Sequence, residues 1–553
     1  MAEAIPATIS GQPVLILKEG TQRTRGKEAQ RANIMAAKVV AEAVKTSLGP
    51  RGMDKMLVAS FGDVTITNDG ATILKEMEVQ HPAAKMIAEV AKTQDDEVGD
   101  GTTSAVVLAG GLVSKAEDLI NKDVHPTVIV DGYRRAQEKA LEILNSIAQK
   151  VTPTDKETLK KVARIAMATK LVSESRDPMA DIAVDAMLQV VEKTPEGYKV
   201  EVEDVKVEKK AGESLNETKL IQGVVLDKEV VHPGMPKRVE DAKVALVNCA
   251  LEVEKTEFDA KINIQNPEEM KAFLDEEEKI LRDMVEKVSN SGANVLVCQK
   301  GIDDLAQHFL AKKNILAVRR ASEKDMEKLA RATGGKIVTN LDDLKADDIG
   351  YAKLVEERKI ADDKMTFVEG CKNPRAVAIL IRGGTQRFVD EAERSLHDAL
   401  CVVRDVIRDP RIVAGGGAVE VELASQLKRW AEKLSGREQL AVLAFAEALE
   451  GIPLTLAENA GLDPLDIIVE LRAAHEKDQK WVGVDPFEGK AKDMMKAEIV
   501  EPAAVKEQIL KSASEAASML LKIDDIVAAG KAKEEAKPPK PSEEEGEKSS
   551  EFD

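Results

Sequence analysis

The stretch GDGTTS at residues 99–104 stands directly before the apolar run 105–112, and it decides how this sequence is interpreted. Two glycines flanking an aspartate let the backbone approach a ligand closely. Three hydroxyl side chains then fall in the first turn of a helix predicted for residues 102–120, where free N–H groups favour a phosphate. Because Asp100 would repel a phosphate unless a divalent cation lay between them, the pattern fits Mg²⁺ held by one carboxylate and phosphate oxygens. A helix N-cap with a hydroxyl-rich first turn explains the same stretch without a ligand.

Other glycine- and hydroxyl-rich motifs stand beside predicted helices: SLGPRGMDK at 47–55, NDGAT at 68–72 and AGGGAVE at 414–420. Taken singly, the second is a standard turn sequence and the third a flexible connection. Asp390 lies in FVDEAER at 388–394, where carboxylates normally cover a solvated helix face. Lys170, in ATK at 168–170, is by default a cation that stabilises the end of a helix. No one of these motifs alone specifies a site.

The composition indicates a large globular protein without a cationic surface. With 553 residues the chain has room for about three domains. Its 80 Lys and Arg against 99 Asp and Glu give a net charge of −19, which argues against a general binder of nucleic acid or anionic membranes. The N-terminus has no basic or apolar signal region, and the longest uncharged apolar stretch, 101–114, is too short to cross a bilayer. We therefore expect a cytoplasmic protein with no membrane anchor.

The cysteines and histidines form no recognisable metal or redox motif. The four cysteines are far apart in the chain, and the six histidines are scattered, with no HExxH or Cys/His cluster. Buried free thiols in a reducing compartment are the expected state of the cysteines. Only cations bound through oxygen atoms remain open.

The periodicity of apolar residues predicts helical ends around an α/β centre. Helices are predicted at 27–48, 102–120, 127–148, 158–170, 387–408, 418–434, 439–450 and 503–523, with a strand pair at 55–59 and 64–67. In the middle, strands at 242–249, 294–298, 315–318, 336–338 and 376–381 are separated by helices at 303–311 and 323–331. This alternation predicts a largely parallel sheet in a domain inserted into an outer domain that both termini build. Residues 531–553 are predicted to be a solvated tail.

About forty residues separate the predicted strands 242–249 and 294–298, more than a compact α/β connection needs. This segment includes an amphipathic helix at 267–288, in which Met270, Phe273 and Leu274 are apolar among many charges. The half of the helix from Ile280 onward is expected to pack on the sheet. The rest of the segment is expected to be an insertion with a function of its own.

Taken together, the motifs at 47–55, 68–72, 99–104 and 414–420 resemble the nucleotide-site motifs of the chaperonins. With ATK at 168–170 and VEP at 500–502, they are most similar to group II chaperonins of the archaeal thermosome type, in the same order and over residues 15–525. The resemblance implies an ATPase that folds proteins. It implies an equatorial ATPase domain (1–148 and 402–553), a small α/β intermediate hinge domain (149–219 and 370–401) and an α/β apical substrate domain (220–369) with a helical protrusion at about 251–280 that closes the chamber. Partners would be unfolded proteins and identical or paralogous subunits in two stacked rings of eight or nine.

The resemblance also implies roles for particular residues. Asp69 and Asp390 would position and polarise the attacking water, and Asp100 would hold Mg²⁺. ATP would contact residues from every motif: Leu48, Gly49, Asp100, Gly101, Thr102, Thr103, Ser104, Thr169, Lys170, Gly416, Gly417, Asp485, Glu501 and Lys506. Lys170 would sense the γ-phosphate from the intermediate domain, so hydrolysis would require domain closure.

Two other classes of function remain open at this point. The first is a chaperonin-like subunit that builds the ring but hydrolyses ATP poorly, and the presence of Asp69, Asp100, Asp390 and Lys170 speaks against it. The second is a small-molecule phosphotransferase of unrelated fold. The sequence has no Walker A lysine and no kinase catalytic loop, which speaks against that class.

Overall fold

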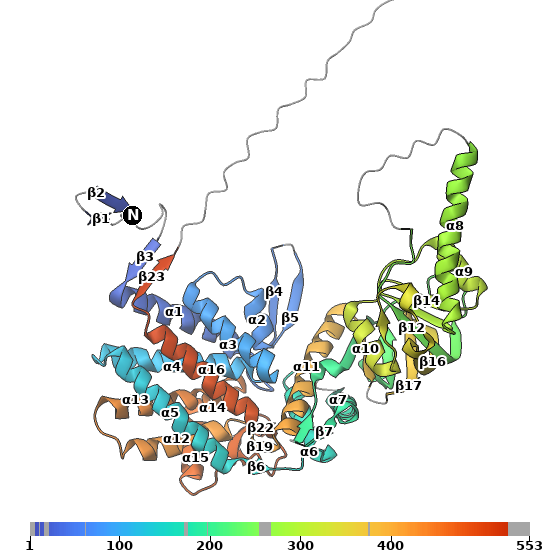
Figure 1. Ribbon diagram of the computed structural model, residues 1–553. Coiled ribbons are helices and arrows are strands. Elements are labelled where there is room, and N and C mark those ends of the chain that lie inside the picture. Colours follow the sequence, from blue (N-terminus) through green and yellow to red (C-terminus); the bar gives the residue numbers. More distant parts are fainter. Residues whose placement is uncertain are drawn as a thin grey trace, which may run out of the picture.

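The computed structural model describes residues 6–9, 12–15, 22–60, 62–170, 175–195, 197–253, 267–373 and 376–528. Figure 1 shows three parts in a row: a helical part to which both ends of the chain contribute, a connecting part around α11, and an outer α/β part from which α8 projects. The predicted tail 531–553 lies outside the described residues, as do residues 254–266 of the expected protrusion.

The helical part is centred on one apolar helix, α4. Its helices are α1 Gly26–Lys45, α2 Gly70–Glu76, α3 Pro82–Val98, α4 Thr102–Asn121, α5 Pro126–Ile147, α12 Ala418–Ala431, α13 Arg437–Leu449, α14 Gly451–Asn459, α15 Pro464–His475 and α16 Ala503–Leu521. Helix α4 contacts α1, α3, α13 and α16, so its neighbours come from both ends of the chain. A Cβ on Gly110 would lie 2.3 Å from the Cβ of Ala41, which shows how closely α4 and α1 approach. The prediction of one helical domain built from both termini is confirmed.

Short antiparallel strands join the segments of this part. They are β1 Pro6–Ile9 with β2 Gln12–Leu15, β3 Gln22–Arg25 with β23 Asp525–Ala528, β4 Lys55–Val58 with β5 Val64–Thr67, β20 Val482–Asp485 with β21 Lys490–Asp493, and β19 Arg411–Ala414 between β6 Gln149–Lys150 and β22 Val500–Pro502. The β3–β23 pair joins the two ends of the described chain. The predicted strand pair 55–59 and 64–67 is confirmed as the β4–β5 hairpin.

The connecting part holds a second, smaller sheet. Strand β18 Val377–Gly383 is fully buried between β9 Val205–Ala211, to which it is parallel, and β10 Lys219–Ile221. Helices α7 Arg176–Val190 and α11 Gln386–Arg408 pack on this sheet and on each other, and α6 Lys156–Ala168 packs on both helices. A short hairpin, β7 Glu192–Thr194 and β8 Gly197–Lys199, lies before β9. Helix α11 also contacts α3 and α16, so one continuous helix links the connecting part to the helical part.

The outer part has a mixed sheet in the order β11-β17-β16-β12-β13-β14, with β15 beside β12. Its strands are β11 Gly223–Leu226, β12 Arg238–Val247, β13 Val295–Cys298, β14 Leu316–Val318, β15 Ile337–Val338, β16 Gly350–Ile360 and β17 Asp363–Cys371. Strands β12 to β15 are parallel, as predicted, but β16, β17 and β11 are antiparallel. The prediction of a largely parallel sheet is therefore wrong for half of it, because the charge-rich hairpin β16–β17 was not recognised as strand.

Three helices accompany this sheet: α8 Pro267–Asn290, α9 Asp304–Lys312 and α10 Glu323–Thr333. In α8, Leu281, Val285 and Val288 are buried, whereas Phe273 is 45% and Leu274 56% exposed. The helix therefore packs through its C-terminal half and projects through its N-terminal half (Figure 1). This confirms the predicted division, with burial starting at Leu281. Short 3₁₀ turns complete the fold: Val202–Asp204, Leu215–Glu217, Leu341–Asp343 and Ala346–Asp348.

One helical stretch among the described residues, Arg437–Asn459, is long and apolar enough to cross a membrane by length and composition. In the structure 67% of its most apolar window is buried inside the protein. Helix α13, which forms most of the stretch, packs against α4, α5 and α12. The apolar residues of this helix therefore pack in the protein core. Glu447 and Glu450 interrupt this stretch, so it contains no long uncharged run in the sequence.

Candidate functional site

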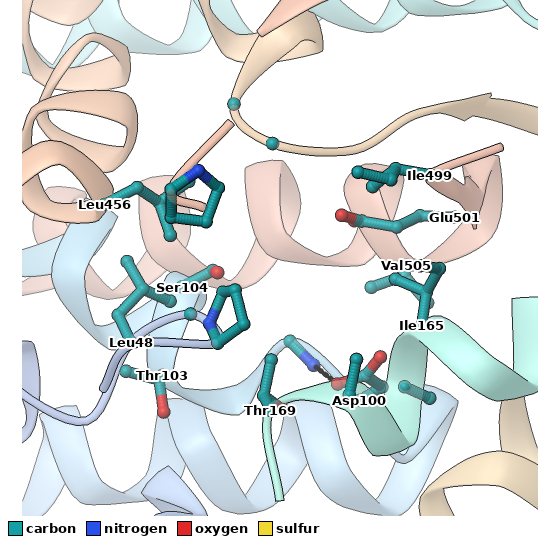
Figure 2. A pocket seen from close by; sticks show the side chains of 18 of the residues that line it. Leu48, Asp100, Thr103, Ser104, Ile165, Thr169, Leu456, Ile499, Glu501 and Val505 are labelled. Carbon is teal, nitrogen blue, oxygen red and sulfur yellow. Dashed lines mark hydrogen bonds between the residues drawn. The ribbon is translucent and has the colours of Figure 1, made fainter. Parts of the chain in front are cut away.

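The glycine- and hydroxyl-rich motifs meet around one cavity of about 520 Å³. Its walls come from the loop after α1, the start of α4, the end of α6, the loop before α12, the β20–β21 hairpin and the start of α16. Figure 2 shows Leu48 and Leu456 on its left and Asp100 and Glu501 on its right. The predicted site residues that line it are Leu48, Gly49, Asp100, Gly101, Thr102, Thr103, Ser104, Thr169, Lys170, Gly416, Gly417, Glu501 and Lys506.

Both glycines of the GDGTTS stretch have backbone conformations that favour glycine. Gly99 (φ 70°) ends α3 and Gly101 (φ 78°) begins α4, each in the left-handed region. A Cβ on Gly101 would also lie 2.9 Å from Ile509 Cδ1. Gly101 offers no side-chain cap, and Thr102 Oγ1 donates to Asp69 Oδ1 at 2.9 Å. The simple N-cap explanation therefore does not account for this turn, and the start of α4 presents its first N–H groups without a capping side chain.

Next to the start of α4, one buried lysine lies between two buried aspartates. Lys170 Nζ is 3.0 Å from Asp398 Oδ2 and 3.9 Å from Asp69 Oδ1. Asp69 also caps α2, because its Oδ2 accepts from Thr72 N at 2.8 Å. Lys170 follows α6 and Asp398 lies on α11, whereas Asp69 precedes α2. Lys170 lines the cavity together with residues of α6 and α7, whereas Asp69 and Asp398 do not line it and lie behind this lysine as its partners.

Burial and charge shift the pKa values of these groups in opposite directions. Burial raises the pKa of Asp398 well above its ordinary value, although Lys170 acts to lower it. Burial also acts to raise the pKa of Asp69, but Lys170 and the hydrogen bonds from Thr72 and Thr102 leave that pKa lowered. Burial acts to lower the pKa of Lys170, but the surrounding aspartates outweigh it and raise the pKa. Several carboxyls thus share one lysine, which leaves negative charge for a bound cation to balance.

Asp100 is the carboxylate best placed for such a cation, because it lines the cavity at the start of α4. Its Oδ1 accepts from Gly101 N at 2.7 Å, and burial raises its pKa against the opposing effect of Lys170. Across the described ranges, no group of three or more His, Cys, Asp or Glu side chains could hold a metal ion. This donor set fits Mg²⁺, which usually takes one or two protein carboxylates and completes its shell with phosphate oxygens and water.

The structure does not bring Asp390 to this cavity. Asp390 Oδ1 lies 2.8 Å from Lys209 Nζ and accepts from Gln386 Nε2 at 2.9 Å, both in the connecting part. It stands about two turns of α11, roughly 12 Å, before Asp398. Asp398 is the acid of α11 that reaches Lys170, and the sequence interpretation missed it. The one signal for it is a single acid directly before the uncharged run 399–403.

A second buried lysine closes the side of the cavity near α16. Lys506 Nζ lies 2.6 Å from Glu501 Oε2 and 2.9 Å from Glu420 Oε1. Burial raises the pKa of Glu501, with Lys506 opposing it, whereas both glutamates raise the pKa of Lys506 despite its burial. Glu501 and Lys506 were predicted as site residues and do line the cavity, and Glu420 joins them as their partner.

The remaining wall is apolar and built on glycine backbone. Gly416 (φ 63°) and Gly417 (φ 75°) are both left-handed, and a Cβ on Gly417 would lie 2.8 Å from Pro453 Cβ. Asp485, predicted beside the nucleotide, does not line the cavity. Its carboxylate accepts from the N–H groups of Phe487 and Glu488 and pairs with Lys492, so it shapes the β20–β21 turn. The residues that do line this wall are Ile452, Leu456, Val484, Pro486 and Phe487.

Comparison with known proteins gives matches over nearly the whole chain. The TCP-1/cpn60 chaperonin family matches residues 40–531. A thermosome subunit of Methanopyrus kandleri is 60% identical over 519 residues, which cover 94% of this chain and 95% of that protein. A thermosome subunit of Pyrococcus abyssi is 58% identical over 529 residues, 96% of each chain. Thermosome subunits alpha and beta of Archaeoglobus fulgidus are 58% and 59% identical, each over 95% of this chain and 96% of the relative.

Proposed function

The chain belongs to the TCP-1/cpn60 chaperonin family, and we propose that its 520 Å³ cavity is the site at which it binds and hydrolyses Mg·ATP. As a member it is an ATP-dependent chaperone subunit whose ATPase activity drives protein folding in a ring complex. The main support for this site is that three features meet at one cavity: the GDGTTS turn, the Lys170–Asp398–Asp69 cluster and the glycine wall.

In this proposal the charged end of the cavity holds the phosphates. The start of α4 receives phosphate oxygens on its first N–H groups, and Asp100 holds Mg²⁺. When bound, Mg²⁺ neutralises charge on the phosphate oxygens. Asp398 accepts a proton from the attacking water, and Asp69 helps to orient that water. Lys170 acts to lower the pKa of both acids and lies where it can sense the γ-phosphate.

The residues around Lys170 also suggest how hydrolysis is coupled to movement. Lys170 and Asp398 belong to the connecting part, whereas Asp69 and Asp100 belong to the helical part. We assign 1–148 and 402–553 to an ATPase domain, 149–219 and 370–401 to a hinge domain, and 220–369 to a substrate domain. Hydrolysis then requires the hinge domain to close on the ATPase domain. A poorly hydrolysing subunit is disfavoured, because the whole charged cluster is assembled in this chain.

The wider setting of the subunit is part of the proposal. Archaeoglobus fulgidus has thermosome subunits named alpha and beta, which supports rings containing identical or paralogous subunits. We propose two stacked rings of eight or nine subunits in the cytoplasm, with unfolded proteins as substrates. The net charge of −19 does not favour nucleic acid as a partner.

The Asp100 assignment predicts a loss of binding that depends on magnesium. Replacing Asp100 by Asn should weaken ATP binding by tenfold or more when Mg²⁺ is present, because the neutral amide is a poorer ligand than a carboxylate. Without Mg²⁺, in EDTA, the variant should bind ATP at least as well as the wild-type protein. Calorimetric titration under both conditions measures the effect. Equal affinities of variant and wild type in Mg²⁺ would remove Asp100 from the metal site.

The projecting half of α8 supports a lid role, since Met270, Phe273 and Leu274 are exposed there. Replacing all three by Ser should leave ATP turnover within about twofold but let added protease digest an enclosed client protein as fast as without ATP. The reason is that these side chains would be buried between neighbouring subunits in the closed ring. A control with Glu276 and Lys279 replaced by Ser, charged residues of the same helix, should still protect the client. Protection by the triple variant would refute the lid role.

A further inference from the structure

One buried histidine joins two walls of the cavity without lining it. His475 is the last residue of α15 and is 1% exposed. Its Nδ1 lies 2.6 Å from Glu422 Oε2 on α12, and its Nε2 lies 2.8 Å from the carbonyl oxygen of Val482, the first residue of β20. Sequence reasoning gave His475 no role, and the proposed ATPase mechanism does not use it.

Both partners of this ring are hydrogen-bond acceptors, so both ring nitrogens must donate. A backbone carbonyl cannot donate, and Glu422 stays ionised: burial acts to raise its pKa, but hydrogen bonds from His475 and Gln426 leave that pKa lowered. Both ring nitrogens of His475 are thus held in fixed directions by groups on two different elements. Each donor ties down a different element, α12 on one side and β20 on the other.

Both elements lead directly to the glycine loop of the cavity. Val484 N of β20 donates to Gly416 O at 2.8 Å. A Cβ on Gly483 would lie 2.7 Å from the same oxygen, so β20 lies against the loop backbone with no side chain between. Helix α12 begins at the other side of the loop, with Gly417 as its N-cap. His475 thus fixes both the strand beside the loop and the helix that leaves it.

We propose that His475 is a positioning residue for the nucleotide base: it holds the β20–β21 hairpin and the glycine loop at the separation that the base requires, without contacting ATP. This inference rests on the proposed binding of ATP in the cavity. The wall that His475 supports is apolar, with Ile452, Val484 and Phe487, and suits a planar base. The start of α4, which would take the phosphates, lies on a different helix and does not contact His475 through any of these bonds.

Two replacements of His475 test its two hydrogen bonds one at a time. The amide nitrogen of Gln at position 475 reaches the place of Nε2 and can still donate to Val482, whereas that of Asn lies near Nδ1 and can donate only to Glu422. His475→Asn should raise the KM for ATP about tenfold, and His475→Gln only about two- to threefold, with kcat at saturation unchanged in both. Glu422→Gln, which keeps the Val482 contact, should behave like His475→Gln and provides the test if a His475 variant fails to assemble.

The control ligand is inorganic triphosphate with Mg²⁺, which has no base. Its inhibition constant against ATP should stay the same in the wild-type protein and in all three variants, since only the base wall moves. Three results would each overturn the positioning role. The KM for ATP could rise equally in His475→Asn and His475→Gln, triphosphate binding could weaken in parallel with ATP binding, or kcat could fall while KM stays unchanged. A wild-type protein that bound no ATP would overturn the proposed function and this inference together, and the wild-type titration alone reveals that.

Discussion

Replacing Asp398 by Asn should lower the rate of ATP hydrolysis by about a hundred- to ten-thousandfold, the range that a general base contributes, and leave ATP affinity within about threefold. Asn keeps the shape of the side chain and can still accept a hydrogen bond from Lys170, now 3.0 Å from Asp398 Oδ2. It cannot take a proton from water. Steady-state turnover and nucleotide titration of the same preparation separate the two effects.

Because burial raises the pKa of Asp398 and the base must be deprotonated, wild-type turnover should rise with pH and the residual turnover of the variant should not follow it.

The matched control is Asp390→Asn on the same helix. Asp390 pairs with Lys209 and Gln386 at the surface of the connecting part, where an ion pair contributes at most about 1 kcal/mol. This variant should hydrolyse ATP at close to the wild-type rate. If Asp390→Asn abolished hydrolysis while Asp398→Asn did not, the assignment drawn from the sequence would be right and the one drawn from the geometry wrong.

The parts of the fold and site that sequence predicted well are those encoded locally. The GDGTTS turn needs glycine at two left-handed positions and places its hydroxyls in the next helical turn, so six consecutive residues carry the whole pattern. The same holds for the β4–β5 hairpin and for α4, whose apolar spacing is regular. Helices α14 and α15 were not predicted; with 9 and 12 residues they are short, so they offer few turns in which a regular apolar spacing can show.

The parts that could not be predicted depend on contacts between distant segments. Asp390 and Asp398 are both acids on one amphipathic helix, and only the position of α6 and Lys170 decides which of them is buried beside that lysine. Similarly, β16 has four charged residues in a row at 356–359, and its strand conformation follows from pairing with β12 and β17 in the sheet. His475 shows the same limit, because its two acceptors lie 53 and 7 residues away. The spacing of residue types along the sequence does not reveal such pairings.

Replacing Lys170 by Met should both stop turnover and weaken the junction between the connecting part and the helical part. Lys170 is the cation that Asp398, Asp69 and Asp100 share, and removing one partner of a buried ion pair typically costs about 3–5 kcal/mol. Without it, Asp398 would take up a proton, since burial already raises its pKa. We expect turnover to fall at least a hundredfold and the first thermal transition to move down by several degrees. Scanning calorimetry and the ATPase assay measure the two effects.

The double variant Lys170→Met with Asp398→Asn separates the structural role of this lysine from its catalytic one. The double variant also removes the carboxyl group of Asp398, which Lys170→Met leaves buried without its partner, so it should recover part of the lost thermal stability while staying inactive. Lys209→Met is the matched control, because it removes a half-exposed lysine from Asp390 and Glu393 and should shift the transition by less than a third as much. Strictly additive losses in the double variant would mean that Lys170 and Asp398 do not depend on each other. The effect of Lys170→Met on stability would then rest on its other partners, Asp69 and Asp100 of the helical part.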